Sequence, residues 1–137
     1  MKIQPYLFFD GRCEEAAEFY KKALGAKVQM MLRNKEAPEP HGTSAAAEKI
    51  LHMRLNIGDS IVLMSDGHSQ GKPKFEGFSL SVTVNSDAEA QRYFSALSDG
   101  GKVQMPMTKT FFSSNFGMVF DKFGVLWMVY VESMNAK

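Results

Sequence analysis

The feature that most constrains this chain is a pattern of predicted elements that occurs twice along its 137 residues. Each copy reads as a strand, a helix and three further strands, and a single shift aligns Phe19 with Phe94 and Gly25 with Gly100. Each unit is too small to bury its sheet alone, so we expect the two to share a core. The repeat predicts an α+β fold of two βαβββ modules that form a cupped mixed sheet.

The clearest strands lie in the closing segment, residues 115–132, which reads as a β-hairpin around a Gly-containing turn at residues 121–124. Apolar side chains alternate along both of its arms, as they do in half-buried strands. We expect the following side chains to face the helix that covers the sheet: Phe116, Met118, Phe120, Val125, Trp127 and Val129.

The first half of the chain follows the same plan. Apolar residues have helical spacing over residues 13–24, and residues 50–57 and 60–65 read as a hairpin. A two-residue turn between these strands would place Arg54 opposite Leu63.

Within this single domain we expect modules at residues 1–67 and 75–134. The polar segment 68–74, rich in glycine and proline signals, reads as the linker between them, and residues 34–47 read as a long exposed excursion.

Composition excludes several classes of function. The formal net charge is +1, which gives no electrostatic case for binding nucleic acid or an anionic membrane. No stretch approaches the roughly 20 apolar residues of a membrane span. The single cysteine, Cys13, excludes an intrachain disulfide and suits a reducing compartment, so we expect a cytoplasmic protein.

One face of each predicted sheet carries a mixture of aromatic and polar side chains that suits a small-molecule pocket. The candidate ligand-binding residues on this face are Gln4, Tyr6, His52, Arg54, Ser79 and Tyr130. His52 is a possible general base or ligand-binding group, and Arg54 is placed to hold an anion. The alternative for both is structural, a hydrogen-bonded strand histidine and a solvated arginine.

Cys13 lies in the first turn of the predicted helix, where the helix dipole lowers the pKa of a thiol. The functional interpretation is a reactive thiolate. No His or Asp lies beside it in the sequence as a nucleophile would need, so a structural cysteine is favoured.

Three segments in order resemble a known family: PYLFFDGRCEEAAEFYKKALGA, IVLMSD and FGMVFDKFGVLWMVYV. They look like the PhnB-like branch of the vicinal oxygen chelate superfamily, which includes glyoxalase I, extradiol dioxygenases and the fosfomycin and bleomycin resistance proteins. That branch is often described as a 3-demethylubiquinone-9 3-methyltransferase domain. The resemblance implies two βαβββ modules, a cupped sheet and a homodimer.

The superfamily's metal ligands are typically His, Glu or Gln on the first and last strands of each module. The matching positions here are Gln4, Leu63, Ser79 and Met128. A leucine has no donor atom, and thioether and hydroxyl groups are poor partners for hard divalent ions. We therefore expect no metal of the usual kind and no other cofactor. No strand here ends in a Gly-rich loop that opens a helix, which many nucleotide-type cofactor sites need.

The leading interpretation is a PhnB-like protein that binds a small, partly aromatic or anionic molecule. A metal-dependent enzyme of lyase, transferase or methyltransferase type, with a displaced metal site that could use His52 and Glu132, is the alternative. A third reading, from a different class, is an interaction module that binds partners through residues 34–47.

Overall fold

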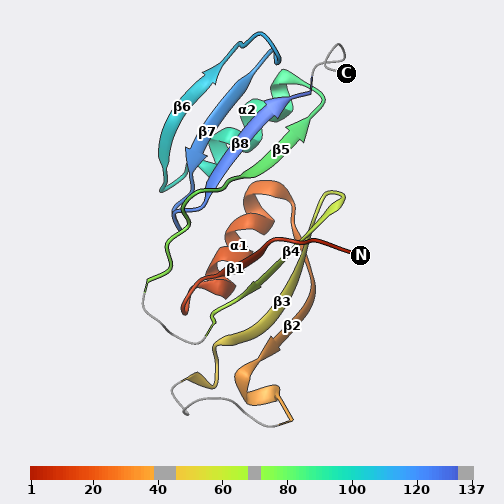
Figure 1. Cartoon of the computed structure of the whole chain (residues 1–137), viewed down its shortest axis with the longest axis vertical. Helices are drawn as coiled ribbons and strands as arrows, with labels where there is room; N and C mark the ends of the chain where they lie inside the picture. The colour runs from red at the N-terminus through yellow and green to blue at the C-terminus, as the bar shows by residue number, and fades with distance from the viewer. Residues whose placement is uncertain (39–45, 68–71, 133–137) are drawn as a thin grey trace. The chain divides into compact units, whose positions relative to one another are not determined.

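The computed structural model of the chain describes residues 1–38, 46–67 and 72–132. Its contacts divide the chain into two units, Met1–Pro73 and Lys74–Lys137 (Figure 1). Most of the predicted linker, the middle of the predicted excursion and the end of the second predicted module lie outside the described residues.

The first unit contains one four-stranded sheet with a helix against it. Its described elements are β1 (Tyr6–Phe8), α1 (Cys13–Leu24), β2 (Lys27–Arg33), the short 3-10 helix η1 (Asn34–Glu36), β3 (Ile50–Ile57) and β4 (Ser60–Ser65). The strand order is β1-β4-β3-β2, with β1 parallel to β4 and the other pairs antiparallel.

The second unit repeats this arrangement. Its described elements are β5 (Leu80–Val84), α2 (Asp87–Leu97), β6 (Lys102–Thr108), β7 (Phe116–Phe120) and β8 (Leu126–Val131). The order β5-β8-β7-β6 and the single parallel pair, β5 with β8, match the first unit element by element. The predicted pair of βαβββ modules is confirmed, while their closure into one cup stays a prediction.

Each sheet has one face covered by its own helix (Figure 1). Helix α1 buries Ala16, Ala17 and Tyr20 on the side that packs against β3. Met53 and Leu55 of β3 are buried, as the alternation predicted. None of the helices in the described ranges is long and apolar enough to cross a membrane.

Each helix is followed by a glycine with a positive φ, and α2 also begins with a side-chain cap. Helix α1 ends at Gly25, whose φ of 69° lies in the left-handed region where glycine has no steric penalty. The repeat-related Gly100 adopts a φ of 75° three residues beyond the end of α2. At the start of α2, Ser86 Oγ accepts a hydrogen bond from the Glu89 amide at 3.2 Å and donates one to the Glu89 carboxylate at 3.0 Å.

The Asp66 carboxylate replaces a local cap at the start of α1. Its Oδ1 accepts hydrogen bonds from the amides of Gly11 at 2.7 Å and Cys13 at 2.9 Å, and its Oδ2 accepts one from Ile50 at 2.7 Å. Asp66 is only 3% exposed. One buried carboxylate therefore joins the start of the helix, the start of β3 and the residue after β4.

The hairpin between β3 and β4 follows the predicted register. Ile57 lies opposite Ser60, and Arg54 lies opposite Leu63. Gly58 supplies the positive φ, 57°, that this two-residue turn needs.

The predicted facing of the closing hairpin is wrong for its first arm. Val125, Trp127 and Val129 are buried, as expected, but the residues opposite Trp127 and Val129 are Val119 and Gly117. The side chains of Phe116, Met118 and Phe120 therefore lie on the other face, opposite Tyr130, Met128 and Leu126.

The error comes from the length of the turn. The Asp121 amide donates to the Val125 carbonyl at 2.9 Å, so five residues connect the strands rather than the expected four. A register shift of one residue moves every side chain of one strand to the opposite face. Gly117 faces α2 closely, since a Cβ there would come within 2.7 Å of a ring carbon of Phe94.

Replacing Asp66 with Ala should strongly destabilise the protein. Three backbone amides, two of them buried, would lose a charged acceptor, and hydrogen bonds to charged groups are worth about 1.5–3 kcal/mol each, so we expect a loss of roughly 3–5 kcal/mol. Urea unfolding followed by circular dichroism measures it. The control is Asp59→Ala in the β3–β4 turn, and equal effects of the two substitutions would contradict the role assigned to Asp66.

Candidate functional site

The open face of the first sheet, opposite α1, carries three of the predicted ligand-binding residues of that module, Tyr6, His52 and Arg54. The ladder places Tyr6 of β1 beside Leu63 of β4, Leu63 beside Arg54 of β3, and Arg54 beside Met30 of β2. This row of four side chains crosses the whole sheet. Arg54 lies two strands from Tyr6, about 10 Å away at the usual strand spacing.

Tyr6 and His52 form a hydrogen-bonded pair on the same face. The Tyr6 hydroxyl lies 2.9 Å from His52 Nδ1, and the two rings are 5.6 Å apart between centroids. Phe8 lies against Tyr6 with a centroid distance of 5.0 Å. Tyr6 is 36% exposed and Phe8 53% exposed, so these aromatic surfaces are accessible from the open face.

Arg54 is half-buried on this face, and one of its nitrogens lacks a partner. The Nε atom is buried and makes no hydrogen bond with any described residue. A buried donor without an acceptor is destabilising, because it has lost its hydrogen bonds to water and makes none with the protein. A guanidinium in this condition favours a ligand that brings an acceptor to it, above all a carboxylate or phosphate.

The other predicted site residues lie elsewhere. Gln4 is half-buried just before β1. Tyr130 belongs to an aromatic cluster in the second module, with ring centroids 5.8 Å from Phe116 and 6.4 Å from Phe112. Ser79 is half-buried just before β5 and lines a different hollow of the same module.

That hollow, of about 430 Å³, lies within the second module. Its walls are mostly apolar and come from the segment before β5 and from the β7–β8 hairpin. It is lined by Phe75, Glu76, Gly77, Phe78, Ser79, Phe120 and Leu126. The placement of Phe120 on the open face explains why sequence reasoning, which assigned that ring to the other face, missed this hollow.

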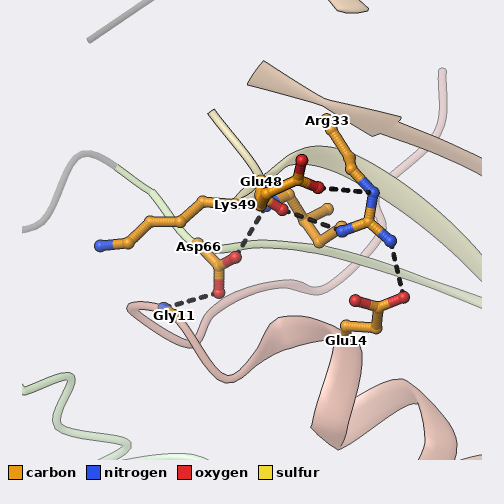
Figure 2. A pocket seen from close by; sticks show the side chains of 7 residues that line it. Gly11, Glu14, Arg33, Glu48, Lys49 and Asp66 are labelled. Carbon is orange, nitrogen blue, oxygen red and sulfur yellow. Dashed lines mark hydrogen bonds and ion pairs between the residues drawn. The ribbon is translucent and has the colours of Figure 1, made fainter. Parts of the chain in front are cut away.

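A second hollow, of about 360 Å³, lies within the first module beside the start of α1 (Figure 2). It is lined by Gly11, Glu14, Arg33, Glu48, Lys49, Ile50 and Asp66. The Arg33 guanidinium donates to Glu14 Oε2 at 2.7 Å and to the Glu48 carbonyl at 2.8 Å, as Figure 2 shows.

The charges around this second hollow compensate one another. The hydrogen bond from Arg33 lowers the pKa of Glu14, and the same contact raises the pKa of Arg33. The hydrogen bond from Lys35 lowers the pKa of Glu48. Asp66 is occupied by backbone amides on both oxygens. Since Arg33 and Asp66 already have partners, this hollow reads as a structural ion-pair network.

Cys13 is completely buried at the start of α1. Burial, and secondarily the negative charge of Asp66, raise the pKa of its thiol above the ordinary value. The helix dipole, which acts in the opposite direction, does not prevail here. This environment supports the structural interpretation of Cys13.

The four positions that match the superfamily's metal ligands do not form a donor set for a divalent ion. In the first module, Leu63 contributes only carbon beside Tyr6. In the second, Met128 places its sulfur 4.0 Å from Ser81 Oγ. Among the residues that the structure describes, no three His, Cys, Asp or Glu side chains gather into a group that could hold a metal ion.

The duplicated module with one covering helix per sheet defines the fold class. It is the fold of a glyoxalase/bleomycin resistance/dioxygenase domain from Frankia sp. EAN1pec, with a TM-score of 0.65 at 11% identity over 98% of this chain and 94% of that one. The sequence model of the family described as 3-demethylubiquinone-9 3-methyltransferase matches residues 1–130. The chain belongs to this family, as the resemblance of its three sequence segments predicted.

Similar proteins extend over almost the whole chain. Protein YjdN of Escherichia coli strain K12 is 34% identical over 96% of this chain and 95% of its own length. The crystal structure of protein PA1353 from Pseudomonas aeruginosa has a TM-score of 0.87 at 41% identity, covering 96% of this chain and 98% of that one. The PhnB protein of Bacillus cereus has a TM-score of 0.77 at 25% identity, with coverage of 96% and 99%.

The Cys13 thiol should be unreactive in the folded protein. Because its folded pKa is raised, the unfolded chain loses this proton first, and stability should fall as the pH rises above the ordinary thiol pKa of about 8.5. Reaction with a chromogenic disulfide reagent, with and without denaturant, measures accessibility. The fall in stability at alkaline pH should be smaller in Cys13→Ala than in the unmodified protein. Rapid reaction of the thiol in the native protein would contradict its burial.

Calorimetric titration with Zn²⁺, Ni²⁺, Mn²⁺ and Fe²⁺ should give no tight, stoichiometric binding. The reason is the donor set, since Leu63 has no ligating atom and Met128 offers a soft thioether. Stoichiometric binding that disappears in His52→Ala would instead favour a displaced metal site and the metal-dependent alternative.

Proposed function

We propose that this chain is a small-molecule-binding protein whose first module holds an anionic, partly aromatic ligand on its open face. The observation that carries the proposal is the buried, unpartnered Nε of Arg54 on the same face as the Tyr6–His52 pair. Because Arg54 Nε is covered, a ligand carboxylate or phosphate would supply the missing acceptor after a shift of the Arg54 side chain that exposes this atom. The flat part of the ligand would lie against the exposed rings of Tyr6 and Phe8.

Each neighbour of Arg54 would then contribute a different property. Leu63 and Met30, which flank Arg54 across the ladder, provide apolar surface and no competing charge. Low local polarity strengthens the attraction between the guanidinium and an anion. The Tyr6–His52 pair offers a hydroxyl and a ring nitrogen for a directional polar contact with the rest of the ligand.

The family description names a methyltransferase, and we place binding ahead of methyl transfer for a structural reason. Nucleotide-type cofactors often use the free amides at a helix N-terminus. Here the amides of Gly11 and Cys13 already donate to Asp66, and the amide of Glu89 donates to Ser86. In each of these two helices of the described chain, one first-turn amide, that of Cys13 or Glu89, is thus already bonded to a side chain of the protein.

We include a homodimer and the absence of a divalent metal in the proposal. The first follows from the family resemblance. The absence of a divalent metal follows from Leu63, which has no donor atom, and from Met128, whose thioether is a soft ligand. Gln4, Ser79 and Tyr130 remain proposed ligand contacts.

We compare two probes of similar shape, benzoate, which is charged, and benzamide, which is not. The difference between their affinities separates recognition of the anion from general affinity for an aromatic ring. The protein should prefer benzoate, and Arg54→Met should remove most of that preference, roughly tenfold or more, because a charge-assisted hydrogen bond is lost. Ligand-observed NMR titration measures both affinities.

Arg92→Met, on α2 of the second module, is the matched control and should leave the preference intact. Equal binding of the two probes by the unmodified protein would contradict the proposal. So would an unchanged benzoate affinity in Arg54→Met.

A further inference from the structure

The second module carries a row of side chains at the same place as the Tyr6–Leu63–Arg54–Met30 row of the first. The ladder places Ser81 of β5 beside Met128 of β8, Met128 beside Met118 of β7, and Met118 beside Met105 of β6. Three methionines on three adjacent strands thus follow one another across the sheet.

All three methionines lie on the open face. Met118 and Met128 share the face of Tyr130 and Leu126, opposite the buried Val119 and Val129 that contact the helix side. Met105 is 40% exposed, and the other two are half-buried. The Met128 sulfur is within 4.0 Å of the Ser81 hydroxyl, so the thioether lies at the surface of the sheet rather than in the core.

The Met128 sulfur lies beside Ser81 of β5, on the side of β8 away from Met118, so its side chain must change rotamer to meet the other two sulfur atoms. Neighbouring strands lie about 4.8 Å apart, so the row spans about 10 Å between its outer backbones. Methionine side chains have three rotatable bonds and adapt readily to a shared partner. The matching row of the first module holds only one methionine, Met30, with Arg54 in place of Met118.

We propose that Met105, Met118 and Met128 form a thioether site for one soft monovalent metal ion, Cu(I), for which Ag(I) is a redox-inert substitute. Soft sulfur ligands select Cu(I), whereas hard divalent ions prefer oxygen and nitrogen. The site therefore agrees with the poor fit of Met128 to a divalent metal. It lies wholly in the second module and does not rest on the proposed binding function of Arg54.

A thioether site makes a distinctive prediction about pH. Thioethers do not protonate in the accessible range, whereas histidine ligands become protonated near pH 6.5. Ag(I) binding should therefore be as tight at pH 5 as at pH 7. The thiol of Cys13, the single cysteine of the chain, is completely buried in the first module.

The experiment titrates Ag(I) into protein whose methionine methyl groups carry carbon-13, in chloride-free buffer. We expect saturation at one ion per chain, with the largest shifts at Met105, Met118 and Met128. Met118→Leu, which removes the central sulfur at nearly constant volume, should weaken Ag(I) binding at least tenfold. Met31→Leu, a partly exposed methionine of β2, is the matched control and should bind as the unmodified protein does.

Cu(I) held under anaerobic conditions should reproduce the Ag(I) shifts. The proposal is overturned if the unmodified protein shows no saturable shift at these three methyl groups. It is also overturned if binding is lost between pH 7 and pH 5, or if Met118→Leu and Met31→Leu bind Ag(I) equally. Because the methyl spectrum of the unmodified protein is itself decisive, the test does not depend on a variant that folds.

Discussion

The constraint on which the rest of the structure depends is that each four-stranded sheet has one helix against it and therefore one covered face. In each strand, alternate side chains must be apolar to meet that helix, and the remaining side chains are free to carry chemistry. The register between strands then decides which residues share the open face. Arg54, Leu63 and Tyr6 meet on one sheet, and Met118 and Met128 on the other, because the ladders align them.

Local signals in the sequence were sufficient for most elements. Helix Cys13–Leu24 and the two-residue turn at Gly58 depend on residues close together in the chain, and both were predicted correctly. The closing hairpin shows where such reasoning fails. Val125 completes the turn instead of beginning the strand, and this single residue exchanges the two faces of β7. The role of Asp66 was also beyond local reasoning, because its amide partners Gly11 and Cys13 are 55 and 53 residues away.

The candidate site was predictable only where its residues lie close together in the sequence. The alternation along β3 and the short turn after it were enough to place His52 and Arg54 on the open face. The hydrogen bond between Tyr6 and His52 joins residues 46 positions apart, and no pattern in the sequence indicates it. The charged hollow around Arg33 likewise depends on a contact with Glu14, 19 residues earlier. Duplication thus gave two similar sheets, and divergence on their open faces gave one row with a guanidinium and one row with thioethers.

We place ligand chemistry on the open sheet faces and not in the hollow beside α1, whose charges are already paired. A crystal structure of the protein grown with benzoate tests this most directly. We expect a carboxylate hydrogen-bonded to the Arg54 guanidinium and an aromatic ring near Tyr6. Benzoate bound instead between Arg33 and Lys49, with the Arg54 face unoccupied, would contradict it.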